Sequence, residues 1–282
     1  MTWVIGLTGL HTGAVVAGDV RVTTSVGHAF DGVQKVHLVS QSAAVGFAGS
    51  VRLGLRAVAD LQRFGHELER TRSVTDFRAI IDQWARRARH AWERDVAAAS
   101  REKLHLLVVT TWLVEGSTDI EAVLGVPFAQ STAFVLKSPR FNVERLPADR
   151  RSVAIGSGQA HARLSAELGS IEEEVDGLLT FEIQPAFVQA GGAASPIRAV
   201  LSNVIRDVEP ADVSEYLHVA MVKPNASTVV TFDMGGLRMP DVASTEEEWN
   251  RLAARHGVAD ATAAHERPVH TSMLPLGEKR PD

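Results

Sequence analysis

The chain contains no cysteine among its 282 residues. Disulfide bonds, thiol catalysis and cysteine-ligated metal centres are therefore excluded. No apolar run is long enough to span a bilayer. The first charged residue is Asp19, so the positive region that opens a secretory signal is also missing. These absences predict a cytoplasmic protein that does not work in a membrane.

Positive charge is dispersed along the chain rather than gathered in a block rich in lysine and arginine. The formal net charge is -5, and the densest basic run, residues 86–90, lies on a predicted helix and is interrupted by core positions. We therefore expect no nucleic-acid surface, and a solvated face or a contact between subunits explains the run better. Apolar residues make up 45% and charged residues 22%, as in ordinary soluble globular proteins.

Signals for a cofactor or a metal are also lacking. The 11 histidines form no His-x-x-x-His pair and no ligand cluster flanked by acids, so no catalytic metal is predicted. The glycine-rich stretch at residues 191–195 has no lysine of the kind that a phosphate-binding P-loop requires. We expect a protein without a cofactor.

Short runs rich in valine and isoleucine dominate the remainder of the sequence. Polar bends separate several of them, which is typical of hairpins. The predicted strands cover residues 2–9, 14–18, 33–39, 43–48, 104–114, 119–124, 132–136, 141–146, 152–155, 216–222 and 227–232.

Helical spacing of apolar residues appears in two pairs of segments. Two long helices are expected in succession after Ser50, the second opened by a Ser73–Asp76 cap, and two more after Gly156 and at Ser195-Pro196. Groups of strands that alternate with groups of helices predict an α+β protein, with two sheets face to face and helices outside.

The composition becomes polar near the C-terminus. We predict one domain over residues 1–234 and a partly helical, flexible extension over residues 235–282, with Ser244 and Glu247 capping a helix that Gly257 ends.

The most informative residue is Thr2. Removal of Met1 would expose a threonine with a nucleophilic hydroxyl and a free α-amine. A threonine hydroxyl needs an adjacent base at neutral pH, and an α-amine with a pKa of roughly 7.7–8.0 suits that role. One residue could then supply both the nucleophile and the base.

Three downstream residues have the chemistry that would support Thr2. The positive charge of Lys35 would favour the alkoxide, and Asp19 would hold the lysine in place. Gly49 lies between a predicted strand and a predicted helix, where its amide could stabilise an oxyanion. A glycine that simply permits a tight turn explains Gly49 equally well.

These residues occur in motifs that resemble those of β-type proteasome subunits and their bacterial relatives, such as HslV, within the N-terminal nucleophile hydrolases. The similarity covers roughly residues 2–233, and a betaproteobacterial type is one candidate. The matching segments are Thr2 with the strand after it, Gly18–Thr23, Val33–His37, Phe47–Ser50 and Ala154–Gly158.

The resemblance implies a four-layer αββα sandwich assembled into stacked homo-oligomeric rings around a chamber. It assigns Thr2 as nucleophile and base, Asp19 and Lys35 as its activating pair, and Gly49 as the oxyanion donor. Ser157 would bond the threonine amine, although a helix cap is a serious alternative. No regulatory ATPase partner can be inferred.

Further residues follow from the same resemblance. Asp212 and Ser214 correspond to a further acid and serine, but the glycine of the family motif is absent here. Val22, Val33, Phe47 and Val51 would line the pocket for the residue before the cut bond, where Phe47 would favour small apolar side chains. Each of these four is also an ordinary core residue.

The sequence therefore predicts a threonine-type endopeptidase that cleaves peptides or unfolded proteins. Two alternatives remain open. The chain could be a structural ring subunit that cleaves little, or an N-terminal nucleophile amidase that acts on a small molecule and needs no chamber.

Overall fold

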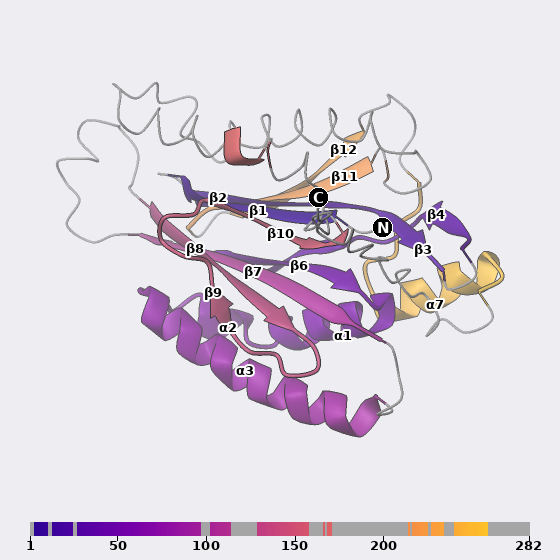
Figure 1. Cartoon of the computed structure of the whole chain (residues 1–282), viewed down its shortest axis with the longest axis horizontal. Coiled ribbons are helices and arrows are strands. Elements are labelled where there is room, and N and C mark those ends of the chain that lie inside the picture. Colours follow the sequence, from indigo (N-terminus) through magenta and orange to yellow (C-terminus); the bar gives the residue numbers. More distant parts are fainter. Residues whose placement is uncertain are drawn as a thin grey trace, which may run out of the picture.

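The computed structural model describes most of the first 157 residues and parts of the remainder. The described residues are 3–10, 13–24, 27–96, 102–113, 129–157, 166, 168–170, 214, 216–224, 227–233 and 240–258. They form two five-stranded sheets, a two-stranded sheet, and helices on one side (Figure 1).

All pairing within the named sheets is antiparallel. The first sheet has the order β10-β1-β2-β11-β12, and the second has the order β5-β6-β7-β8-β9. The strands of the first sheet are β1 (Trp3–Leu10), β2 (Gly13–Asp19), β10 (Ser152–Gly156), β11 (Tyr216–Val222) and β12 (Thr228–Asp233). Those of the second are β5 (Val36–Ser40), β6 (Ala43–Gly49), β7 (Leu104–Leu113), β8 (Ala129–Lys137) and β9 (Glu144–Arg145). A separate hairpin consists of β3 (Arg21–Thr23) and β4 (Ala29–Asp31).

The two large sheets pack face to face through small and branched apolar side chains. Val4 and Val16 of the first sheet share one core cluster with Val36 and Leu107 of the second. Gly46 permits this close approach, because a β-carbon there would lie 2.4 Å from Val4 Cγ1. The strands buried on both faces explain the nearly continuous apolar runs in the sequence.

Helices cover the outer face of the second sheet. They are α1 (Val51–Gln62), α2 (Gly65–Leu68) and α3 (Val74–Asp95). The predicted cap of α3 is confirmed, because Ser73 Oγ accepts the Asp76 N–H at 3.1 Å. Apolar stripes on α1 and α3 form the second core cluster with β6, β7 and β8.

The C-terminal segment around α7 (Glu246–Arg255) is part of this second core. Trp249 is fully buried there, and its ring stacks on Phe30 with centroids 6.2 Å apart. The helix begins one residue later than predicted, since its capping box joins Thr245 and Glu248 rather than Ser244 and Glu247. Gly257 follows the helix with φ +67°, in the left-handed region that favours glycine.

The expected four-layer αββα sandwich is wrong as an account of this structure. The described residues form three antiparallel sheets. Among these residues, helices α1, α2 and α3 cover the second sheet and not the first. The helices predicted after Gly156 and at Ser195-Pro196 lie almost entirely outside the described residues, as does the strand predicted at 119–124. The β3–β4 hairpin was not predicted, because its strands are only three residues long.

None of the helices in the described ranges combines the length and apolar character needed to cross a bilayer.

Candidate functional site

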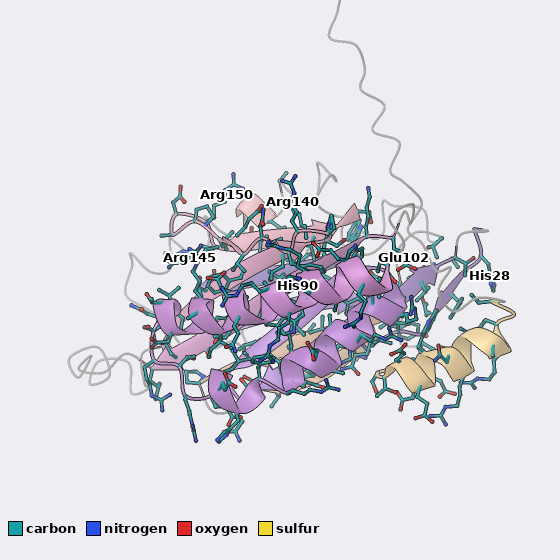
Figure 2. The ribbon with its side chains drawn as sticks, turned by 90° about the horizontal axis from the view of Figure 1, so that it is seen from below. His28, His90, Glu102, Arg140, Arg145 and Arg150 are labelled. Carbon is teal, nitrogen blue, oxygen red and sulfur yellow. The ribbon has the colours of Figure 1, made fainter. Side chains whose placement is uncertain are left out.

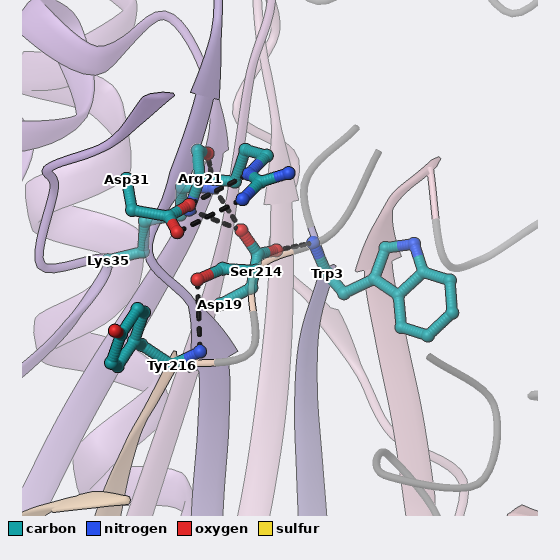
Figure 3. Close-up of polar contacts among 7 residues, drawn as sticks. All are labelled: Trp3, Asp19, Arg21, Asp31, Lys35, Ser214 and Tyr216. Carbon is teal, nitrogen blue, oxygen red and sulfur yellow. Dashed lines mark hydrogen bonds and ion pairs between the residues drawn. The ribbon is translucent and has the colours of Figure 1, made fainter. Parts of the chain in front are cut away.

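A buried ion pair between Asp19 and Lys35 forms the centre of the candidate site. Lys35 Nζ lies 2.9 Å from Asp19 Oδ1, and the two side chains are 2% and 0% exposed. Lys35 also donates a hydrogen bond to the carbonyl of Arg21. Asp19 ends β2 and Lys35 immediately precedes β5, so the pair joins the two sheets at one end of the molecule (Figure 3).

Asp19 also binds the backbone at the start of β1. Its Oδ2 accepts the N–H of Trp3 at 2.5 Å, and its Oδ1 accepts the N–H of Arg21 at 2.8 Å. With Lys35, three donors surround one carboxylate. Burial of both charges is costly unless their remaining hydrogen-bonding capacity is used, and these contacts meet that condition.

Two predicted serines lie at the same end of the first sheet. Ser214 is fully buried and accepts the Tyr216 N–H at 3.0 Å, directly before β11, whose Leu217 pairs with Asp19. Ser157 follows Gly156, which pairs with Trp3 on the opposite side of β1. The first residues of β1 are therefore flanked by Asp19 on one side and by the Ser157 turn on the other.

Gly49 lies at the predicted junction of a strand and a helix. It is the last residue of β6, and α1 begins at Val51. Its φ is +105°, and a β-carbon there would lie 2.1 Å from the carbonyl oxygen of Lys103, so only glycine fits. Ser50 provides no side-chain cap for α1. The N-terminus of α1 thus favours a negative charge through its amides and dipole.

Gly49 lies close to the Lys35 strand. Phe47, two residues earlier on β6, donates its N–H to the Lys35 carbonyl at 3.0 Å. Two residues of strand span about 7 Å, so the backbone of Gly49 lies about that far along β6 from Phe47, the residue hydrogen-bonded to Lys35.

The four predicted substrate-contacting residues all belong to the core on the helix side. Val22, Val33, Phe47 and Val51 are between 0% and 4% exposed and share one cluster. Phe47 packs against α1 at Gly54, where a β-carbon would lie 2.3 Å from its ring. The structure brings these residues together as packing groups, and their contact with a substrate stays a prediction.

Two of the predicted catalytic residues, Thr2 and Asp212, lie outside the described residues. The described residue nearest to Thr2 is Trp3, whose amide nitrogen is covalently bonded to it.

Three contacts near the site were missed by sequence reasoning. Arg21 forms a two-bond ion pair with Asp31, with distances of 2.8 Å and 3.0 Å, across the β3–β4 hairpin. Ala243 pairs with Val33, and its carbonyl accepts the Gln34 N–H at 3.0 Å, next to Lys35. The segment before α7 therefore binds, through backbone hydrogen bonds, the residues that directly precede Lys35. No local motif predicts the pairing of Ala243 with Val33, because the two residues are more than 200 positions apart in the sequence.

Two buried histidines lie beyond the ion pair. Burial lowers the pKa of His37 to about 4, although its hydrogen bond to the Gln34 carbonyl at 2.7 Å opposes the shift. Burial, with a smaller contribution from the charge of His37, lowers the pKa of His218 to about 4. Both side chains are therefore neutral at pH 7.

No group of three or more metal-ligating side chains occurs in the parts of the chain that the structure describes.

A solved structure with a similar fold is that of Anbu (ancestral beta-subunit) from Yersinia bercovieri. It shares 15% sequence identity with this chain at a TM-score of 0.55, over 91% of this chain and 96% of that one. No family model matches the sequence, and no curated protein matches it. The likeness shows a common fold with this ancestral beta-subunit and carries no information on catalysis.

These comparisons correct the family assignment made from the motifs. An HslV-like or betaproteobacterial proteasome subunit was expected, but the solved structure described above is Anbu, and identity to it is too low to define a family. The motifs around Asp19, Lys35 and Gly49 are local, and their spacing alone did not establish a family.

Proposed function

We propose that this chain is an N-terminal threonine hydrolase that cleaves peptide bonds through an acyl-enzyme on Thr2. The observation that carries the proposal is the buried Asp19–Lys35 pair, whose carboxylate also holds the Trp3 N–H. Trp3 is bonded directly to Thr2. The hydrogen bond from the Trp3 N–H to Asp19 therefore fixes the backbone next to the proposed nucleophile relative to the charged pair.

The proposed reaction begins after removal of Met1. The free α-amine takes the proton of the Thr2 hydroxyl, and the oxygen attacks the carbonyl carbon of the peptide bond. The Lys35 ammonium favours negative charge on that oxygen, and Asp19 fixes the ammonium. The protonated amine then passes its proton to the leaving nitrogen, and the C–N bond breaks.

The second half of the reaction releases the acyl group. Water loses a proton to the Thr2 amine and attacks the ester, and the threonine oxygen regains a proton as it leaves. The Gly49 N–H is the proposed donor to the oxyanion in both halves, and a lost donor of this type costs about 2.7–4 kcal/mol of transition-state stabilisation.

The proposed substrates are peptides or unfolded proteins, and the proposed working form is a homo-oligomer of stacked rings. The description of Anbu as a beta-subunit supports a role within an assembly. Because that likeness concerns the fold alone, the assembly requires its own test.

The test is hydrolysis of fluorogenic peptides by the purified full chain, compared among variants that circular dichroism shows to be folded at the assay temperature. We expect Thr2→Ala and Lys35→Met to lower kcat by about a thousandfold or more, as losses within a catalytic group typically do. Lys137→Met, which removes a lysine at the end of β8, serves as the matched control and should retain wild-type activity.

Electron microscopy of the same preparation separates the alternatives. Rings that show no hydrolysis favour a structural subunit. Monomers that hydrolyse small amides but not peptides favour an amidase. Wild-type rates in Thr2→Ala would contradict the proposal.

A further inference from the structure

A second concave site lies at the opposite end of β1 from the ion pair. This cavity of about 380 Å³ is bordered by Thr8 and Gly9 of β1, by residues 129–132 of β8, and by residues 145–148, 150 and 151. The last segment carries the chain from β9 in one sheet to β10 in the other. Thr8 is five residues from Trp3, or about 17 Å along an extended strand. The cavity is therefore separate from the candidate catalytic site.

Positive charge lines this cavity. Arg145, Arg150 and Arg151 are among its lining residues, and the described part of the lining contains no aspartate or glutamate. Within the part of the chain that the structure describes, neither Arg145 nor Arg150 forms an ion pair with a carboxylate. Figure 2 shows Arg145 and Arg150 at the same end of the molecule, with Arg140 further along.

Two hydroxyl groups in the lining each accept one hydrogen bond from the protein. Ser131 Oγ accepts the Gly9 N–H at 2.8 Å, and Thr132 Oγ1 accepts the Arg145 Nε–H at 3.3 Å. A hydroxyl that accepts one bond still has its own hydrogen to donate. Both hydroxyls can therefore act as donors in a cavity that already contains guanidinium donors.

Gly9 leaves room for the side chain of the third arginine. Its φ is +77°, and a β-carbon there would lie 2.2 Å from Arg151 Nη1. The guanidinium of Arg151 thus lies directly over the backbone of β1. The backbone of Arg151 is held in turn, because its carbonyl accepts the Thr8 N–H at 2.7 Å.

We propose that this cavity binds a compact oxyanion, either the carboxylate or the phosphate group of a small molecule. Planar guanidinium groups bind both anions through paired N–H donors, and hydroxyl donors complete such sites. Trp112, Leu146 and Pro147 also line the cavity. These apolar surfaces accommodate the carbon skeleton that carries the anion. The proposal does not depend on the hydrolase activity.

The test is isothermal titration calorimetry on the full chain with two probes, inorganic phosphate and N-acetyl-leucine. The titrations are made at constant ionic strength, with sodium chloride as the blank, so that general screening is held fixed. The variants are Arg145→Gln with Arg150→Gln, and Arg140→Gln alone as the matched control. Arg140 lines a different cavity.

We expect saturable binding of at least one probe to the wild-type chain and to the control. The double variant should bind at least about a hundredfold more weakly, since each charge-assisted contact contributes roughly a factor of ten. The stronger probe identifies the anion as phosphate or carboxylate. Absence of saturable binding for both probes, or equal binding by the double variant, would overturn the proposal.

Discussion

One carboxylate connects Lys35 to Trp3. Asp19 Oδ1 lies 2.9 Å from Lys35 Nζ, and Asp19 Oδ2 accepts the N–H of Trp3 at 2.5 Å. The lysine that would activate the nucleophile and the residue that follows the nucleophile are thus fixed by the same group.

Replacement of the Asp19 carboxylate by an amide should strongly lower the stability of the fold. We expect Asp19→Asn to lower the free energy of unfolding by about 3–5 kcal/mol, because it leaves the Lys35 charge buried without a counterion. Asp31→Asn is the matched control, since it removes a partly exposed carboxylate from its pair with Arg21. Urea denaturation measures both, and equal losses in the two variants would contradict a special role for the buried pair.

Acid should destabilise the fold through its buried histidines. The pKa of His218 is lowered to about 4 in the folded chain, against an ordinary value of 6.5. The unfolded chain therefore binds the extra proton first as the pH falls. The resulting stability is fully present above pH 6.5 and is lost as the pH falls from 6.5 to 4.

The matching variant is His218→Leu, which removes the titrating group. Its free energy of unfolding should fall less between pH 7 and pH 4 than that of the wild-type chain, with a difference of about 3 kcal/mol. Denaturation curves at a series of pH values provide the measurement. An unchanged slope in His218→Leu would refute the assignment.

The segment around α7 should contribute to the stability of the folded chain. Trp249→Ala removes a fully buried ring that stacks on Phe30, so we expect a loss of about 3–5 kcal/mol in unfolding free energy. The neighbouring exposed residue provides a control, and Asn250→Ala should change stability by less than about 0.5 kcal/mol. If Trp249→Ala were as stable as the wild-type chain, this segment would be dispensable for the core.

A side chain at Gly49 should disturb both the fold and the proposed chemistry. Gly49→Ala places a β-carbon 2.1 Å from the Lys103 carbonyl oxygen at φ +105°. We expect a stability loss of about 1–3 kcal/mol from strain, together with a fall in kcat that exceeds any change in KM. Gly169→Ala, where a β-carbon meets no atom within 4 Å, is the control. A normal kcat in Gly49→Ala would contradict the oxyanion role.

Local patterns predicted most of the described elements. Apolar runs located β1, β2, β6, β7 and β11 to within a few residues, because strands covered on both faces consist almost entirely of apolar residues. The Ser73 cap located α3, because a cap is a contact between residues near in sequence. The α7 cap was misplaced by one residue because Ser244 and Thr245 offer equivalent hydroxyls, and Glu248 binds both residues.

Long-range contacts could not be read from the sequence in the same way. The Asp19–Lys35 pair was predicted from residue chemistry and from a resemblance, whereas its bond to the Trp3 N–H depends on the register between β1 and β2. The pairing of Ala243 with Val33 joins distant segments through backbone atoms that every residue possesses. The layer arrangement expected from the alternation of strand and helix groups, and from the family fold, was wrong because neither indicates which sheet the described helices cover.

The central claim is that Thr2 is the nucleophile and uses its own amine as the base. The most direct measurement is mass spectrometry of the purified full chain before and after incubation with a peptide epoxyketone, which reacts with both the hydroxyl and the free amine. We predict that the chain has lost Met1 and gains one adduct, which peptide mapping assigns to Thr2 and which Lys35→Met greatly slows. A chain that retains Met1 and still hydrolyses peptides would contradict the account.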